Sequence, residues 1–338
     1  MRKHRLFPGM LCLVILLASL AGCAEAPHRS ASPAPAPTWT PAAQPSPEMA
    51  AETPGGKTVE PAAQPERTPG SAMQDPALPT EAETDWSAYF DGINGCAVLF
   101  DPAENRYQIY RRDLALTRRS PCSTFKIISS FVALKHGILD PEDSARSWSG
   151  EAFWNRDWNR DIDFFDAFRT SCVWYFRELI DEIGAERMQR ELDRLQYGNC
   201  DLSDWAGRLN TNNSNPALTG FWIESSLLIS PKEQADVMAR IFGDRTEGAQ
   251  EVREPLQRAM LLTEQEDLSL YGKTGMGKRH GVVVDAWYTG FADGFGKRIY
   301  FCVYLGETDG RDVSSARARE IAVALVSDCL RAGRPEEP

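Results

Sequence analysis

The 338-residue chain lacks the patterns that mark several large classes of protein. Its four histidines lie far apart, and no two cysteines are spaced as in CxxC or a zinc knuckle, so we predict no metal site. Basic residues are in the minority, with a formal net charge of -11, which argues against nucleic acid as a partner. After the N-terminal segment there is no internal repeat and no apolar run long enough to span a bilayer.

Residues 1–22 have the features of an export signal. The basic start MRKHR precedes the apolar run LFPGMLCLVILLASLAG. This run ends in Leu20-Ala21-Gly22-Cys23, which resembles the lipobox of bacterial lipoproteins, where the cysteine receives a diacylglyceryl group. The resemblance implies an exported lipoprotein whose domain lies on the outer side of the bacterial cell membrane, anchored by lipid on Cys23. An ordinary signal peptide or an uncleaved anchor would also fit the run.

Residues 23–83 have the composition of a disordered tether. Thirteen of the 22 prolines lie between residues 24 and 83, mixed with Ala, Thr, Glu and Gln. Such a segment buries too little apolar surface to fold and favours extended conformations. We therefore expect one folded domain over residues 84–333, followed by a C-terminal tail at 334–338.

Apolar periodicity over residues 84–333 predicts an α+β domain. Strand-like runs lie near both ends of the domain, and its middle has helical spacing. We expect strands over 95–101, 106–112, 268–275, 282–293 and 298–306, and helices over 123–137, 164–184, 185–195 and 315–332. The strands from the two ends would then share one antiparallel sheet.

Ser123 and Lys126, in the sequence Ser-Thr-Phe-Lys, are candidates for a nucleophile and its base. A serine hydroxyl is a poor nucleophile until a base takes its proton. Three residues apart in the first turn of a helix, the two side chains share one face, and the helix N-terminus favours developing negative charge. Alone the pattern is weak, because Ser-x-x-Lys is expected roughly once by chance in such a chain. A serine here could also simply cap the helix.

Four further motifs follow in order: Ser171-Cys172-Val173, Tyr197-Gly198-Asn199, Trp222 and Lys273-Thr274-Gly275. Together with Ser123 to Lys126 they resemble the class D (oxacillinase-type) serine β-lactamases, over roughly residues 90–330. The resemblance implies a serine β-lactamase and penicillin-binding transpeptidase-like fold, with a central antiparallel sheet flanked by helices and a helical subdomain. It also implies hydrolysis of β-lactam antibiotics through a serine acyl-enzyme, and hence antibiotic resistance. Tyr197-Gly198-Asn199 contains residues typical of turns, and we interpret its role as structural.

The resemblance assigns catalytic roles to the first two motifs. An ammonium ion cannot accept a proton, so Lys126 must be neutral to act as a base, and apolar surroundings lower a lysine pKa. Val173, where related families carry Asn, and Trp222 would supply those surroundings. In class D enzymes the lysine adds carbon dioxide, so we expect a carbamate on Lys126 held by the indole N–H of Trp222, and no other cofactor. Ser171 would relay a proton toward the leaving nitrogen.

The fifth motif carries the substrate contacts that the resemblance implies. Lys273, Thr274 and Gly275 would hold the substrate carboxylate, and the backbone N–H groups of Ser123 and Met276 would form an oxyanion hole. Class D enzymes usually add an arginine near the C-terminal helix. Three arginines stand there, Arg311, Arg317 and Arg319, and Arg317 is our choice among them.

Three competing functions share parts of this pattern. A β-lactam sensor domain acylates in the same way but stays acylated, and stretches such as 144–164 resemble that branch. A transpeptidase usually carries Ser-x-Asn, which Val173 argues against. A surface lipoprotein that only binds ligands explains Cys23 but none of the five motifs. No obligate protein partner is evident from the sequence.

The cysteines leave two interpretations open. Buried free thiols are the simpler one. Cys122 precedes the expected nucleophile and Cys172 lies inside the second motif, so a disulfide between them is the alternative, should the fold bring them together.

Overall fold

The computed structural model describes residues 78–332, except 210–213, 244–249, 266 and 312. The expected signal at 1–22, the lipidation site Cys23, the tether up to residue 77 and the tail at 334–338 all lie outside the described residues. Among those that are described, no helix combines the length and the apolar character needed to cross a membrane.

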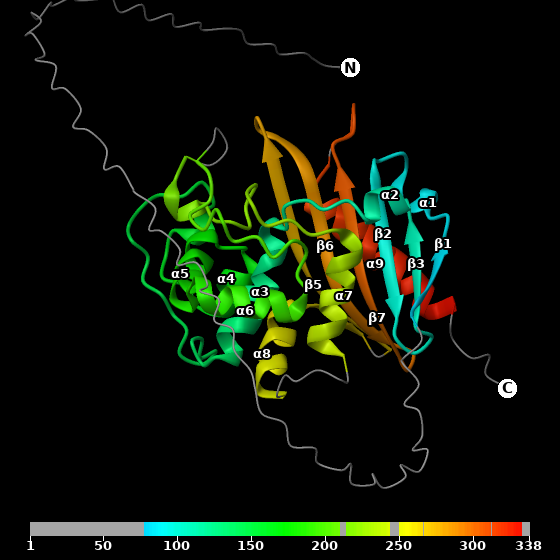
Figure 1. The fold of residues 1–338 in the computed structure, drawn as a ribbon, viewed down its shortest axis with the longest axis horizontal. Helices are drawn as coiled ribbons and strands as arrows, with labels where there is room; N and C mark the ends of the chain where they lie inside the picture. Colours follow the sequence, from blue (N-terminus) through cyan, green and yellow to red (C-terminus); the bar gives the residue numbers. More distant parts are fainter. Residues whose placement is uncertain (1–77, 210–213, 244–249, 266, 312, 333–338) are drawn as a thin grey trace, which may run out of the picture. The chain divides into compact units, whose positions relative to one another are not determined.

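One seven-stranded sheet forms the centre of the folded part, in the order β1-β3-β2-β7-β6-β5-β4 (Figure 1). Its strands are β1 (Thr80–Glu83), β2 (Gly95–Asp101), β3 (Arg106–Tyr110), β4 (Leu261–Gln265), β5 (Leu268–Arg279), β6 (Val282–Gly294) and β7 (Lys297–Gly306). Strands from both ends of the domain pair through β2 and β7, as expected. The prediction of a wholly antiparallel sheet is wrong at one edge, because β1 pairs in parallel with β3.

Strand β1 lies inside the segment that we expected to be tether. Three of its four residues are polar and all but Ala82 are exposed, so no apolar pattern marks them as a strand. Backbone pairing with β3 holds them, together with ion pairs from Glu81 to Arg112 and to Lys232. The folded part therefore begins at least four residues before the predicted boundary at residue 84.

Helices cover both faces of the sheet because its strands alternate their apolar side chains. On β7, Phe301, Val303 and Leu305 face the C-terminal helix α9 (Ser315–Ala332), whereas Cys302 and Tyr304 face α7 (Pro231–Phe242). Figure 1 shows α7 and α9 on opposite sides of the sheet. Two short helices, α1 (Ser87–Phe90) and α2 (Arg112–Ala115), flank the first strands.

A helical subdomain lies beside β5 (Figure 1). It contains α3 (Lys126–Lys135), α4 (Phe164–Arg169), α5 (Val173–Ile183), α6 (Ala185–Leu195) and α8 (Gln250–Met260), around the largest apolar cluster. The expected helix over 164–184 is broken, because residues 170–172 leave the helix and Ser171 has φ 58°. The expected helix from Ser123 starts as a 3₁₀ turn, η1 (Cys122–Phe125), before α3 begins.

Candidate active site

Ser123 lies on a tightly fastened turn between the sheet and the helical subdomain. The preceding residue, Cys122, has φ 49°, a conformation that non-glycine residues rarely adopt. Two hydrogen bonds hold the turn: the Cys122 N–H donates to the Trp222 carbonyl at 2.9 Å, and the Gln234 side chain donates to Thr124 Oγ1 at 2.9 Å. The nucleophile is thus presented by a strained turn that its surroundings fix in place.

Lys126 is placed to act on Ser123. Its Nζ donates a hydrogen bond to Ser123 Oγ at 3.0 Å, and the residue is only 1% exposed. The Phe176 ring lies 5.2 Å from Nζ, and no carboxylate pairs with it among the described residues. Burial therefore lowers the pKa of Lys126 to about 8, so that the neutral amine is accessible near neutral pH.

Ser171 and Lys273 form a second polar pair in the same site. Lys273 Nζ donates to Ser171 Oγ at 2.5 Å and to Thr274 Oγ1 at 3.2 Å. Lys273 is 5% exposed, and burial together with the charge of Lys126 holds its pKa well below the usual lysine value. The break between α4 and α5 is what lets Ser171 reach this lysine, because a continuous helix would keep it in the helical register.

Gly275 lets β5 lie directly against the nucleophile turn. A Cβ atom added to Gly275 would sit 2.9 Å from the Pro121 carbonyl oxygen and 2.9 Å from Thr124 Cγ2, closer than real Cβ contacts. The Lys-Thr-Gly motif therefore requires glycine for close approach of two backbones. The next residue of β5, Met276, lines the same cavity as Gly275.

These elements enclose a cavity of about 250 Å3. Six predicted site residues line it: Ser123, Ser171, Val173, Thr274, Gly275 and Met276. The other lining residues that the sequence did not predict include Trp154, Trp158, Thr170, Leu218, Ile223, Glu224, Lys278 and Ser315. Only the aromatic stretch at 153–158 gave a signal for any of them; the rest reach the cavity through tertiary folding.

Four predicted residues do not line this cavity: Lys126 and Lys273, which reach it through their hydrogen bonds to Ser123 and Ser171, and also Trp222 and Arg317. Trp222 is fully buried, with its ring 6.0 Å from that of Phe125 in the same apolar cluster. Arg317 forms an ion pair with Glu320, and Ser315 is the residue of helix α9 that reaches the cavity. Arg319 lines a neighbouring hollow instead.

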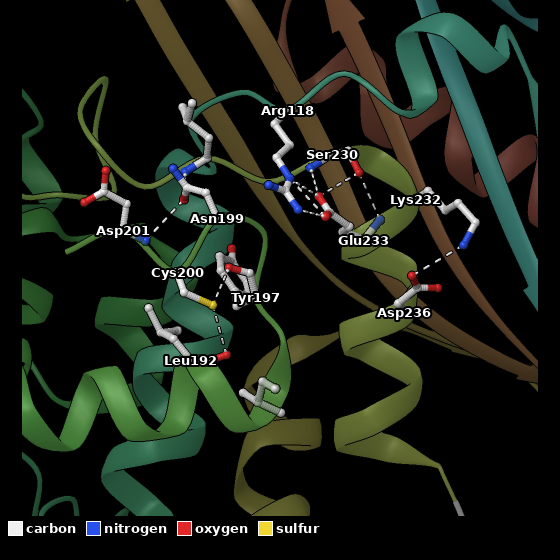
Figure 2. A network of polar contacts seen from close by, with 12 residues as sticks. Arg118, Leu192, Tyr197, Asn199, Cys200, Asp201, Ser230, Lys232, Glu233 and Asp236 are labelled. Atoms are coloured by element: carbon white, nitrogen blue, oxygen red, sulfur yellow. Dashed lines mark hydrogen bonds and ion pairs between the residues drawn. The ribbon is translucent and has the colours of Figure 1, made fainter. Parts of the chain in front are cut away.

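Tyr197-Gly198-Asn199 fastens the loop that leads to Trp222. Asn199 Nδ2 donates to the Ser226 carbonyl at 2.8 Å, and its Oδ1 accepts from the Leu228 N–H at 2.8 Å. Figure 2 shows Asn199 near the start of α7, where Arg118 pairs with Glu233 of the Ser230 capping box. These contacts agree with the structural role expected for the motif.

The six cysteines of the described residues are free thiols. Cys122 and Cys172 are both buried, which raises the pKa of the Cys122 thiol to about 12 and that of Cys172 to about 11. The alternative of a disulfide between them is therefore not what the structure contains. Nor do His, Cys, Asp or Glu side chains of the described residues gather in any group able to hold a metal ion.

Residues 95–327 match the family described as the penicillin binding protein transpeptidase domain. The chain belongs to this penicillin-binding family. The regulatory protein BlaR1 of Bacillus licheniformis is 30% identical over 245 residues, which are 72% of this chain and 38% of BlaR1. The chain thus spans about two fifths of the length of that relative.

Solved structures of the penicillin-binding family share the fold. The C-terminal domain of the Bacillus licheniformis BlaR penicillin-receptor has a TM-score of 0.64 at 29% identity, covering 74% of this chain and 97% of that domain. A class D β-lactamase from Bacillus subtilis has a TM-score of 0.62 at 28% identity, covering 72% and 95%. The expected penicillin-binding transpeptidase-like fold and the kinship with class D β-lactamases and BlaR sensor domains are confirmed.

Proposed function

We propose that this chain is a class D serine β-lactamase that opens the β-lactam ring of penicillin-type antibiotics and so confers resistance. The observation that carries the proposal is the buried Lys126 amine, 3.0 Å from Ser123 Oγ. With a pKa of about 8, roughly a quarter of these amines are neutral at pH 7.5, so a base stands beside the nucleophile.

The side chains suggest an order of steps. Lys126 takes the proton of Ser123, and Ser123 Oγ attacks the lactam carbonyl while the N–H groups of Ser123 and Met276 receive the developing oxyanion. Ser171, held by Lys273, passes a proton to the leaving nitrogen. Thr274 and Ser315 in the cavity wall, with the adjoining Lys273, are the groups we assign to the substrate carboxylate, because no arginine of the described residues lines the cavity.

The surroundings of Lys126 fit carboxylation by carbon dioxide. The reaction needs a neutral amine in an apolar pocket, and Lys126 lies over the Phe176 ring beside the apolar cluster that contains Trp222. A carbamate there would supply a carboxylate base for acylation and for activation of water; we assign its stabilisation to the Val173 and Trp222 side chains. Removing bicarbonate should then depress turnover, and adding it back should restore it.

A sensor-like protein that acylates without fast turnover is the second candidate. The similarity to BlaR1 and to the BlaR penicillin-receptor domain favours it, as does a cavity lined by Ser315 where class D enzymes usually place an arginine. Both candidates require acylation of Ser123. They differ in whether water then reaches and clears the acyl-enzyme.

We also propose that the domain works at the outer side of a bacterial cell membrane, anchored through lipid on Cys23. The support is the basic and apolar start of the chain followed by Leu20-Ala21-Gly22-Cys23. Labelling cells with a radioactive fatty acid tests the anchor: the label should enter the wild-type protein and not the Cys23→Ala variant.

Labelling with a fluorescent penicillin tests the proposed function. The wild-type protein should be labelled covalently and then lose the label, and Ser123→Ala should take up none. A label that persists would favour the sensor-like candidate. Absence of label from the folded wild-type protein would refute both.

A further inference from the structure

A second hollow of about 360 Å3 adjoins the catalytic cavity. The two share Thr274, whose neighbour Lys273 also lines the second hollow. On the other sides the hollow is bounded by the ends of α4 and α8 and by the first residues of β4, with Phe165, Phe168 and Met260 among its walls. It therefore continues the active-site groove past the place proposed for the substrate carboxylate.

The lining of this hollow is strongly cationic. It contains three arginines against one carboxylate, Asp166, beside the amine of Lys273. Arg169 pairs with that Asp166 at 2.9 Å, and Arg258 lies 3.7 Å from Glu142. Arg319, from helix α9, forms no ion pair with any of the described residues.

Tyr288 also lines the hollow and carries a buried hydroxyl. Tyr288 is 2% exposed, and its phenol oxygen has no hydrogen-bond partner among the described residues. Its O–H lies over Gly272, where a Cβ atom would come within 2.7 Å of the phenol oxygen. Burying a hydroxyl unpaired costs free energy, so a ligand that accepts its hydrogen bond would be favoured here.

We propose that this hollow is an anion-binding site that takes a carboxylate or phosphate group, with Arg319 supplying the charge and Tyr288 a buried hydrogen bond. The cations of the lining select a negative group, and planar guanidinium groups suit the oxygens of carboxylate and phosphate. The apolar walls from Phe165, Phe168 and Met260 leave room for the carbon skeleton that carries such a group.

The anion has two sources with the same chemistry. It can be a free anion, or it can be a second carboxylate on a β-lactam, placed beside the ring carboxylate that Lys273 and Thr274 hold. The substrate-borne source rests on the proposed function, whereas binding of a free anion does not.

Calorimetric titration of the full-length protein with inorganic phosphate at constant ionic strength tests the site itself. We expect Tyr288→Phe and Arg319→Gln each to weaken phosphate binding roughly tenfold, because each loses one hydrogen bond to a charged group. Arg331→Ala, the same change of charge on the same helix, is the control and should bind as the wild type does. Thermal unfolding of each variant shows that it is folded.

Two results of the titration would overturn the proposal. One is phosphate binding that is absent, or equal in the wild type and in both variants. The other is binding that Thr274→Ala abolishes and Tyr288→Phe leaves intact, which would place the anion in the catalytic cavity.

Acylation kinetics with two cephalosporins then separate the sources. The pair differs only in a carboxylate on the substituent next to the ring carboxylate. A lower KM for the dianionic member, lost in Tyr288→Phe, would assign the site to substrate. Equal KM values together with phosphate binding would assign it to free anions. Acylation of Tyr288→Phe by a simple penicillin should match the wild type, so failure of the proposed function would show separately, as unlabelled Ser123.

Discussion

Replacing Gly275 by alanine tests how closely β5 must approach the nucleophile turn. The added Cβ would lie 2.9 Å from both the Pro121 carbonyl oxygen and Thr124 Cγ2, whereas ordinary contact begins at 3.4 Å. Because the first of these atoms belongs to the backbone, no rotamer change relieves the clash. The strand and the turn must therefore separate by about 0.5 Å.

The separation would move apart the two N–H groups that we assign to the oxyanion hole, that of Ser123 on the turn and that of Met276 on the strand. Losing one such donor costs roughly 100- to 1,000-fold in rate, and a shift of half an ångström weakens the hydrogen bond without removing it. We expect acylation to slow roughly 10- to 100-fold. Overpacking should also cost about 1–3 kcal/mol of stability, lowering Tm by several degrees.

The assay is the second-order rate of labelling by a fluorescent penicillin, measured beside thermal unfolding. Gly310→Ala is the control, because a Cβ there meets nothing within 4 Å although its φ of 69° strains the backbone. It should lose some stability and keep its acylation rate. If Gly275→Ala is folded and acylates as fast as the wild type, the close approach is not needed and the reasoning is wrong.

Three further predictions follow from the buried charges and thiols. In carbon dioxide-free buffer, the rate of acylation should rise roughly fiftyfold from pH 6 to pH 8, because the neutral fraction of Lys126, whose pKa is about 8, rises over this range. A flat pH profile, or a midpoint that shifts in the control Lys297→Met, would contradict the assignment of Lys126 as the base. The Glu191 carboxylate accepts a hydrogen bond from Lys135 at 2.7 Å and lies 2.9 Å from His136. Burial alone would raise the pKa of Glu191, but these partners outweigh burial and lower the pKa to about 2. The stabilising effect of Glu191 is therefore complete above about pH 4.5 and is lost as pH falls toward 2. Urea titration should accordingly show Glu191→Gln less stable by about 2 kcal/mol at neutral pH, with little change in the exposed Glu186→Gln. Thiol titration in denaturant without reductant should count all six cysteines from Cys96 to Cys329 as free, and two missing thiols would restore the disulfide alternative.

Much of the site could be predicted from the sequence because its residues come in short motifs. Ser123 and Lys126 share one turn, and Lys273 to Gly275 share one strand, so local spacing fixes their relation. The serine turn and the Lys-Thr-Gly strand meet where Gly275 lies directly against the turn, and this contact is visible only in the fold.

Other features depend on tertiary contacts and escaped the sequence reasoning. The periodicity of residues 164–184 predicted a helix, and only the structure shows the break that turns Ser171 toward Lys273. Strand β1 has no apolar pattern that could predict it. Backbone pairing with β3 and charged contacts hold it instead. Arg317 was chosen among three arginines by position alone. Which side chain of helix α9 reaches the cavity depends on how the first turn of the helix is oriented, and in the structure it is Ser315.

The time course of a chromogenic cephalosporin with the full-length protein in bicarbonate buffer tests the central claim most directly. We expect many turnovers per molecule at a steady rate, and none for Ser123→Ala. A burst of about one equivalent followed by no further hydrolysis would contradict it, and would mean that the site acylates without clearing its acyl-enzyme.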